Sequence, residues 1–224
     1  MRNKGYSGMI RMLNNLQLSA VLAFLILLLS PLTSSADEEV QDKIFISELN
    51  GELNAVIDGA KNSTTRLGPK EGVLWEDSSG YLGAVLTNDR FYVVSTTSGT
   101  WKEFPLKSQE AEQAKVSLSP YIALLATDDR AICYNISTHS YFETKLPVGA
   151  ELIAVEAGRY IAVVVTTDKL LGIRKGSSSF TEMRLGIDEA VENVDVTSNK
   201  VVVRTSDRLL SLVADDTKWT EYKL

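Results

Sequence analysis

Paired carboxylates are the side chains of this chain whose types and spacing could support catalysis. Adjacent acids occur at Glu76-Asp77, Asp128-Asp129 and Asp215-Asp216. Glycoside hydrolysis needs two carboxylates beside the scissile bond, one to donate a proton and one to act as base or nucleophile. No spacing among these acids singles out such a pair, so the sequence predicts no catalytic residue.

Neither the histidine nor the cysteine indicates a catalytic or metal site. His139 is the only histidine, and a catalytic base there would need an orienting carboxylate and a nucleophile, which the sequence does not indicate. Cys133, the only cysteine, lies in an apolar run, which predicts a buried inert thiol, with intermolecular pairing as the alternative. One histidine and one cysteine cannot form a zinc site, and no phosphate loop or EF-hand spacing occurs. The sequence therefore predicts no metal, no cofactor and no enzymatic activity.

A short turn motif recurs and predicts the architecture. An aspartate followed by a basic residue stands between two apolar runs at intervals of 40, 39 and 39 residues. The four copies are Asp89-Arg90, Asp129-Arg130, Asp168-Lys169 and Asp207-Arg208. A second mark keeps the same intervals, namely a segment with an aromatic residue, a glutamate and a final leucine. Its copies span residues 101–106, 141–146, 180–185 and 219–224.

A period of roughly 40 residues built from short strands is typical of a propeller blade. The middle runs are apolar at nearly every position, as expected for strands covered on both faces, whereas the last segment alternates, as expected beside solvent. A further short segment precedes each middle run and supplies an inner strand, at residues 72–76, 113–118, 152–155 and 191–196. We therefore predict an all-β fold, a five-bladed β-propeller of four-stranded blades of roughly 39 residues.

The first of the five units is degenerate. Asn50-Gly51 favours a tight hairpin turn between two apolar runs, because both residues accept positive φ, and Gly51 lies 38 residues before Asp89. The predicted repeats span residues 43–70, 71–108, 112–147, 150–186 and 189–224. The first repeat begins at its second strand, so its inner strand comes from residues 37–41 or is missing. We predict a ring of five blades in one chain, with an open array completed by a second copy as the alternative.

One blade carries a family resemblance. The segment K-V-S-L-S-P at residues 115–120, followed by Y-I-A at 121–123 and T-D-D-R-A-I at 127–132, resembles a blade of the WD-repeat and related propeller families. The Gly-His dipeptide of that family is missing, and Tyr134-Asn135 stands in place of its Trp-Asp. The resemblance implies propeller architecture and leaves the partners open.

Five-bladed propellers include enzymes that cleave glycosides, and such sites draw on acids of the inner strands. The corresponding acids here are Glu76, Asp77, Glu156, Glu192 and Asp195. The blades lack the long insertions that usually build a substrate pocket. A fold by itself predicts no activity, so a hydrolase is the third hypothesis.

The opening residues differ in composition from the rest. Residues 1–36 combine three basic residues, an apolar run and the small residues Ser34-Ser35-Ala36, a pattern typical of a secretory signal peptide. An uncleaved anchor is the alternative, because residues 16–32 approach the ~17-residue minimum for crossing a bilayer. An acidic leader follows at residues 37–42. Either way, we expect the folded part outside the cytosol, in the periplasm or secreted.

The net charge of the chain disfavours nucleic acids as partners. Without residues 1–36 the chain keeps 20 basic and 29 acidic residues, a net charge of about −9. Such a surface repels phosphate backbones, so nucleic-acid binding is disfavoured, and no basic amphipathic stretch suggests a lipid surface.

Several surface features could serve a partner. The Asp-basic turns either form a charged band for docking or simply keep the turn tips soluble. The glutamates of the last strands, Glu103, Glu143, Glu182 and Glu221, are interpreted as a solvated edge that discourages strand pairing. The aromatics of the same strands either stack on sugars or pack between blades; they are Trp101, Tyr141, Phe180 and Trp219.

The sequence thus predicts an exported, non-catalytic binding or scaffold protein whose partner is another protein. Carbohydrate binding is the second hypothesis. The site residues stay unassigned, and the state is a monomer or a ring-completing homo-oligomer. Asn62 and Asn135 begin Asn-x-Ser/Thr triplets, and Asn62 is the better acceptor for a glycan in a eukaryotic secretory route.

Overall fold

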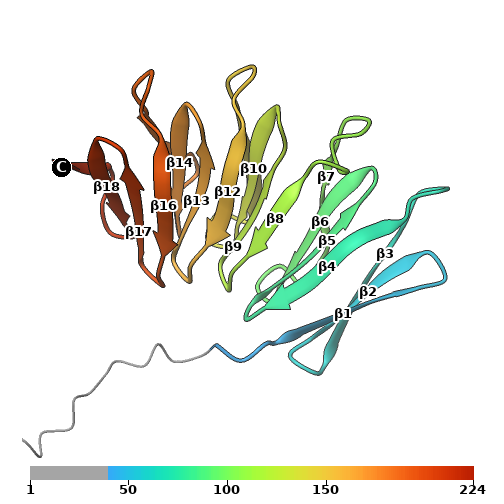
Figure 1. The fold of residues 1–224 in the computed structure, drawn as a ribbon. Helices are drawn as coiled ribbons and strands as arrows, with labels where there is room; N and C mark the ends of the chain where they lie inside the picture. Colours follow the sequence, from blue (N-terminus) through green and yellow to red (C-terminus); the bar gives the residue numbers. More distant parts are fainter. Residues whose placement is uncertain (1–39) are drawn as a thin grey trace, which may run out of the picture. The chain divides into compact units, whose positions relative to one another are not determined.

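The computed structural model describes residues 40–224, which form five antiparallel sheets (Figure 1). Sheet 1 has three strands, β1 (Ile44–Leu49), β2 (Glu52–Ile57) and β3 (Lys61–Arg66). Sheet 2 contains β4 (Val73–Ser79), β5 (Leu82–Thr87), β6 (Arg90–Ser95) and β7 (Lys102–Pro105). Sheet 3 contains β8 (Lys115–Leu118), β9 (Ile122–Ala126), β10 (Arg130–Asn135) and β11 (Ser140–Lys145).

Sheets 4 and 5 repeat the same plan. Sheet 4 contains β12 (Leu152–Ala157), β13 (Ile161–Thr166), β14 (Lys169–Arg174) and β15 (Thr181–Arg184). Sheet 5 contains β16 (Val191–Val196), β17 (Lys200–Thr205), β18 (Arg208–Val213) and β19 (Thr220–Lys223). The predicted signal segment, residues 1–36, and the first half of the acidic leader lie outside the described residues. No helix able to cross a membrane occurs within residues 40–224.

Apolar side chains hold each sheet to its neighbours in sequence. Separate clusters of buried residues join sheets 1 and 2, sheets 2 and 3, sheets 3 and 4, and sheets 4 and 5. Every residue of β5, β9 and β13 is buried, because each of these strands packs against a sheet on both faces. The predicted propeller-like array of repeated antiparallel sheets is therefore confirmed.

The two end sheets differ from the predicted closed ring. Buried and exposed residues alternate along β2 and β17, so sheets 1 and 5 are each covered by another sheet on only one face. Within residues 40–224 no apolar cluster joins these two sheets. Lys200 and Arg204 lie on the uncovered face of sheet 5. The corresponding residues of sheet 4, 39 positions earlier, are Ile161 and Val165, which are buried against sheet 5. Polar residues thus cap the last sheet, as in terminal units of repeat proteins.

Sheet 1 lacks the predicted fourth strand. Residues 40–43 form no strand in the structure. The φ angles of Asn50 and Gly51, 54° and 76°, confirm the tight turn that was predicted between β1 and β2. Within residues 40–224 the first repeat is therefore a three-stranded sheet without an inner strand, and residues 37–39 of the predicted inner segment lie outside the described residues.

The aromatics at the start of each last strand pack between sheets. The indole nitrogen of Trp101 donates to the carbonyl of Ser63 at 3.2 Å, and that of Trp219 donates to Thr181 at 2.9 Å. The hydroxyl of Tyr141 donates to the carbonyl of Phe91 at 3.1 Å, while Phe180 lies in the apolar cluster between sheets 3 and 4. These rings anchor each sheet to the preceding one, so the sugar-stacking alternative for them is wrong.

Candidate binding edge

The antiparallel order places successive turns at two opposite edges of the sheets. One, which we call the acidic edge, holds the Asp-basic turns and the linkers between sheets, at residues 67–72, 88–89, 106–114, 127–129, 146–151, 167–168, 185–190 and 206–207. The other, which we call the tyrosine edge, holds the remaining loops of sheets 2 to 4, at residues 80–81, 96–101, 119–121, 136–139, 158–160 and 175–180.

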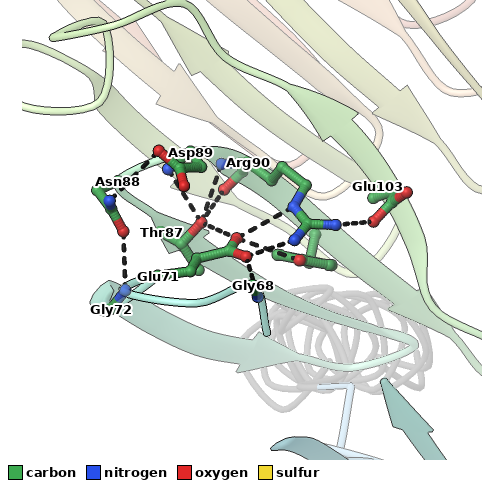
Figure 2. A network of polar contacts seen from close by, with 9 residues as sticks. Gly68, Glu71, Gly72, Thr87, Asn88, Asp89, Arg90 and Glu103 are labelled. Atoms are coloured by element: carbon green, nitrogen blue, oxygen red, sulfur yellow. Dashed lines mark hydrogen bonds and ion pairs between the residues drawn. The ribbon is translucent and has the colours of Figure 1, made fainter. Parts of the chain in front are cut away.

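A hydrogen-bonded network closes each unit at the acidic edge. In sheet 2 the carboxylate of Glu71 accepts bonds from the Thr87 hydroxyl at 2.6 Å, the Gly68 amide at 2.7 Å and the Arg90 Nε at 3.2 Å (Figure 2). The Nη1 of Arg90 donates to Glu103 at 2.7 Å. One buried carboxylate thereby ties together the linker, the β5–β6 turn and β6, and through Arg90 it also reaches β7.

The same network recurs in sheets 3 and 5. Arg130 pairs with Glu110 at 2.7 Å and with Glu143 at 2.6 Å. Arg208 pairs with Glu189 at 2.9 Å, and its Nη1 also contacts Glu221. The interpretation of the basic residues as soluble turn tips is therefore wrong, because these guanidinium groups fold back onto the sheet. The last-strand glutamates are likewise ion-paired, although they remain about half exposed.

Sheet 4 departs from this pattern in two positions at once. Ala150 stands 39 residues before Glu189, where the buried glutamate would lie, and Lys169 replaces the arginine. The Nζ of Lys169 donates to the carbonyl of Lys145 and to Glu182, both at 3.2 Å. Loss of the glutamate thus accompanies loss of the arginine, which indicates that the two residues act as a pair.

The networks hold their glutamates ionised. Burial opposes ionisation of Glu71 and Glu110. The hydrogen bonds that each carboxylate accepts from its arginine and from its other partners, together with the charge of that arginine, outweigh burial and lower the pKa of both carboxyls. The hydrogen bond from Arg208 lowers the pKa of Glu189 to about 2 against the opposing effect of burial. A carboxylate whose pKa is lowered is ionised near neutral pH, so none of these glutamates can act as a general acid there.

The lowered pKa of Glu189 predicts a specific loss of stability in acid. Its pKa is near 4.3 in the unfolded chain, so its stabilisation is present above about pH 4.5 and is lost as the pH falls toward 2. We expect the free energy of unfolding, measured by urea denaturation, to fall over this interval. The free energy of unfolding of the Glu189→Gln variant should fall less steeply over this interval, although the variant is less stable at pH 7. An unchanged slope in the variant would contradict the assignment.

Three tyrosines form a row along the tyrosine edge. Tyr81, Tyr121 and Tyr160 occupy matching positions before β5, β9 and β13, and neighbouring ring centroids are 5.3 Å apart in both pairs. The Nζ of Lys175 lies 3.5 Å from the centroid of the Tyr121 ring, and that of Lys43 lies 5.5 Å from the Tyr81 ring. Cation–π attraction holds these ammonium groups over the row.

A pocket opens on the row between sheets 2 and 3. Its volume is about 380 Å³, and its lining includes Tyr81, Tyr121, Lys175 and His139. The Nδ1 of His139 lies 3.4 Å from the Thr97 hydroxyl, so the histidine links the two sheets. The sequence assigned His139 no role, and the structure places it at this pocket.

A buried asparagine positions the loop that carries Lys175. The amide of Asn135 donates to the carbonyls of Arg174 at 2.9 Å and Ser177 at 3.1 Å. The Lys175 amide in turn donates to the Tyr160 carbonyl at 2.8 Å. Since Asn135 is fully buried, its bonds fix this loop against sheet 3, and its side chain cannot accept a glycan in the folded protein.

The two edges differ sharply in charge. In sheets 2 to 4 the loops of the tyrosine edge contain no aspartate or glutamate, and they carry Arg159, Lys175 and His139 among many serines and threonines. The corresponding loops of sheets 1 and 5 carry Asp58, Asp215 and Asp216. The acidic edge contains eleven carboxylates and two lysines in its turns and linkers. Asp42 reaches the tyrosine edge from the first sheet, where its carboxylate accepts a 2.7 Å bond from the Gly80 amide. The middle of the tyrosine edge, along sheets 2 to 4, thus has no acidic residue in its loops.

The acids considered for catalysis lie on the inner strands of three sheets. Glu76 and Asp77 lie on β4, Glu156 on β12, and Glu192 and Asp195 on β16, so they belong to three different sheets. Glu192 pairs with Arg204 at 2.9 Å. Within residues 40–224 no group of three or more potential metal ligands occurs.

Two further predicted residues are placed as follows. Cys133 is fully buried on β10, and burial raises the pKa of its thiol well above the ordinary range, as expected for an inert cysteine. Asn62 lies on β3 and is exposed.

Sequence reasoning missed both the buried glutamates and the tyrosine row. Their signal was present, because Glu71 and Glu110 are 39 residues apart and the tyrosines are 40 and 39 apart. Each set lies outside the two marks used to align the repeats.

Comparisons with known proteins show similarity at the level of architecture. No protein-family model matches the sequence, and no curated protein matches it. Among solved structures, Prp20p of Saccharomyces cerevisiae, described with its binding to Gsp1p and histones, is similar with a TM-score of 0.42 and 8% identity over 78% of this chain and 56% of that one. Hsv2 of Kluyveromyces lactis gives a TM-score of 0.40 and 12% identity over 77% of this chain and 57% of that one. Apo AztD of Citrobacter koseri gives a TM-score of 0.40 and 14% identity over 81% of this chain and 59% of that one. This chain therefore spans less than two thirds of each.

These similarities assign neither a family nor a partner to this chain. The chain described here is a propeller-like array of five antiparallel sheets.

Proposed function

We propose that the protein is an exported, non-catalytic binding protein that engages an acidic segment of a partner protein through the tyrosine edge. The observation that carries this proposal is the row of Tyr81, Tyr121 and Tyr160 with Lys175 over it, in loops without acidic residues. Phenol hydroxyls and an ammonium group are hydrogen-bond donors that suit carboxylates. The protein carries a net charge of −6, so this edge is where an acidic partner meets least repulsion.

The geometry of the row favours a peptide over a sugar. The Tyr121 ring is stacked on the Tyr160 ring, with an angle of 15° between the two ring planes. On its other side the Tyr121 ring faces the Tyr81 ring, with an angle of 31° between the planes. Lys175 also covers the Tyr121 ring. A sugar ring would need an open aromatic face, whereas the row offers hydroxyl groups, a cation and a partly apolar pocket. Carbohydrate binding is therefore the second candidate.

Selection from a displayed library of random twelve-residue peptides would test this proposal, with a glycan array in parallel. We expect enriched peptides rich in aspartate and glutamate, with affinities that fall at least tenfold in Lys175→Glu and in high salt, because the contact is electrostatic. Lys175→Met should weaken binding less. Lys70→Glu, at the acidic edge, is the matched control and should bind like the unmodified protein.

Two results would contradict the proposal. One is selection of no acidic peptide, or of peptides whose binding is insensitive to Lys175→Glu. The other is binding to glycans alone, which would favour the carbohydrate alternative.

A further inference from the structure

Among the described residues, 40–224, no strand pairs with the inner side of β1. In sheets 2 to 5 an inner strand pairs antiparallel with the second strand, as β4 does with β5 and β16 does with β17. β1 occupies the second position in its sheet, yet of the described strands it pairs with β2 alone. In an antiparallel ladder, backbone groups of alternate residues point to opposite sides, so half of those in β1 point away from β2.

The composition of β1 favours pairing on that side. Its sequence, I-F-I-S-E-L, contains no proline or lysine and only one charged residue, Glu48. Natural sheets usually protect exposed edges with such residues. Phe45 and Leu49 are 64% and 63% exposed, which is unusual for large apolar side chains of one strand. β1 is thus an apolar strand without the usual protection against an added strand.

The residues just before β1 do not turn back to cover it. The Lys43 amide donates to the Gly80 carbonyl at 2.9 Å, and the Gly80 amide donates to Asp42 at 2.7 Å. A Cβ added at Gly80 would lie 2.8 Å from a methyl group of Val40, so residues 40–43 run against sheet 2. In sheet 2 only Gly80 and Tyr81 separate the inner strand from the next one. A hairpin of that kind is excluded before β1 by these contacts.

We propose that the inner edge of β1 binds an extended segment of a partner polypeptide, which adds antiparallel as the missing inner strand of sheet 1. The four complete sheets show that one strand fits beside the second strand and that its direction is antiparallel. This mode of recognition takes its affinity from main-chain hydrogen bonds and its selectivity from alternate side chains.

The neighbouring side chains define the chemistry of the segment. Ile44 and Ile46 lie beside its path on the face toward sheet 2, and Phe45 and Leu49 lie beside it on the uncovered face. Cross-strand neighbours of aliphatic and aromatic residues are best matched by β-branched or aromatic residues. The segment is therefore an uncharged, β-branched stretch of about six residues, the length of β1. This site is distinct from the tyrosine edge and does not depend on the function proposed there.

A peptide with the sequence of β12 carrying Glu156→Gln, L-I-A-V-Q-A, acetylated and amidated, is a suitable probe because it is an uncharged version of an inner strand of this protein. Two N-methylated versions block the amides of alternate residues, either the set facing β1 or the set facing away. With the full chain, we expect binding and slower hydrogen exchange in β1 for two peptides, the unmodified one and the one methylated at the amides that face away from β1. The peptide methylated at the amides that face β1 should bind at least tenfold more weakly.

Protein variants provide a second readout. Phe45→Lys should weaken binding of the unmodified peptide at least tenfold, because it places a charge beside the added strand. Ile187→Lys is the matched control, since Ile187 is fully exposed in a linker of the acidic edge. Equal binding of both N-methylated peptides, or no binding at millimolar peptide, would overturn the proposal. Protection of β1 without peptide that disappears on deleting residues 1–39 would also overturn it, because the occupant would then be the chain itself.

Discussion

Replacing Glu110 by alanine is expected to destabilise the protein by about 3 kcal/mol. The side chains of Glu110 and Arg130 are only 6% and 12% exposed, and the carboxylate accepts bonds from Arg130 and from the Lys107 amide at 2.7 Å each. Removal of Glu110 leaves the guanidinium group without its buried partner, and a buried charge without a partner is costly. Urea denaturation at pH 7 measures the change.

Sheet 4 supplies the control for this prediction. There Ala150 and Lys169 occupy the corresponding positions, so the double variant Glu110→Ala with Arg130→Lys reproduces a combination that this fold already accepts. A lysine ammonium can reach a strand carbonyl and the last-strand glutamate, as Lys169 does. We expect the double variant to recover at least about 1 kcal/mol of the loss, since neighbouring residues are not additive. A double variant as unstable as the sum of the two single changes would contradict the pairing.

Gly158→Ala is expected to cost about 3 kcal/mol or more. A Cβ at this position would lie 1.9 Å from the carbonyl oxygen of Thr197, in the β16–β17 turn of the next sheet. The backbone of Thr197 cannot move aside as a flexible side chain would. Relief of the contact requires the turns of sheets 4 and 5 to separate, which also strains the 2.7 Å bond from the Tyr160 amide to the Ser198 carbonyl.

Gly72→Ala provides the comparison, because a Cβ there would meet nothing within 4 Å. We expect its free energy of unfolding to stay within about 0.5 kcal/mol of the original. Both variants are measured by urea denaturation, and the difference between them isolates the close approach from the general effect of removing a glycine. Similar stability of the two variants would contradict the close approach.

The two edges of the array carry different residues for different reasons. Each network at the acidic edge joins a linker, a turn and strands of one unit. Its basic residue can also reach the last strand of the preceding sheet, as Arg130 does when it donates to the carbonyl of Pro105 at 3.2 Å. At the tyrosine edge, rings and loops contact each other across sheets 2, 3 and 4. A surface formed by several rigid sheets is well suited to hold a binding site in one shape.

The repeated sheets could be predicted from the sequence because their causes are local. Strand content follows from apolar runs of four to six residues, and turns follow from aspartate, asparagine and glycine at fixed positions. The Asn50-Gly51 turn and the repeat of the last-strand aromatics were read correctly on this basis. These features recur at a constant interval, so each copy supports the interpretation of the others.

The tertiary structure decided how the array ends and what its charged residues do. A local pattern does not reveal that Lys200 and Arg204 face an uncovered side, or that β1 has no inner neighbour, because both depend on which sheets meet. Arg90 reaches back to Glu71 across 19 residues of chain, a contact that exists only after the linker has folded against the sheet. Strand and turn identity are thus set within a few residues, whereas pairing partners, burial and the binding edge arise from contacts between distant segments.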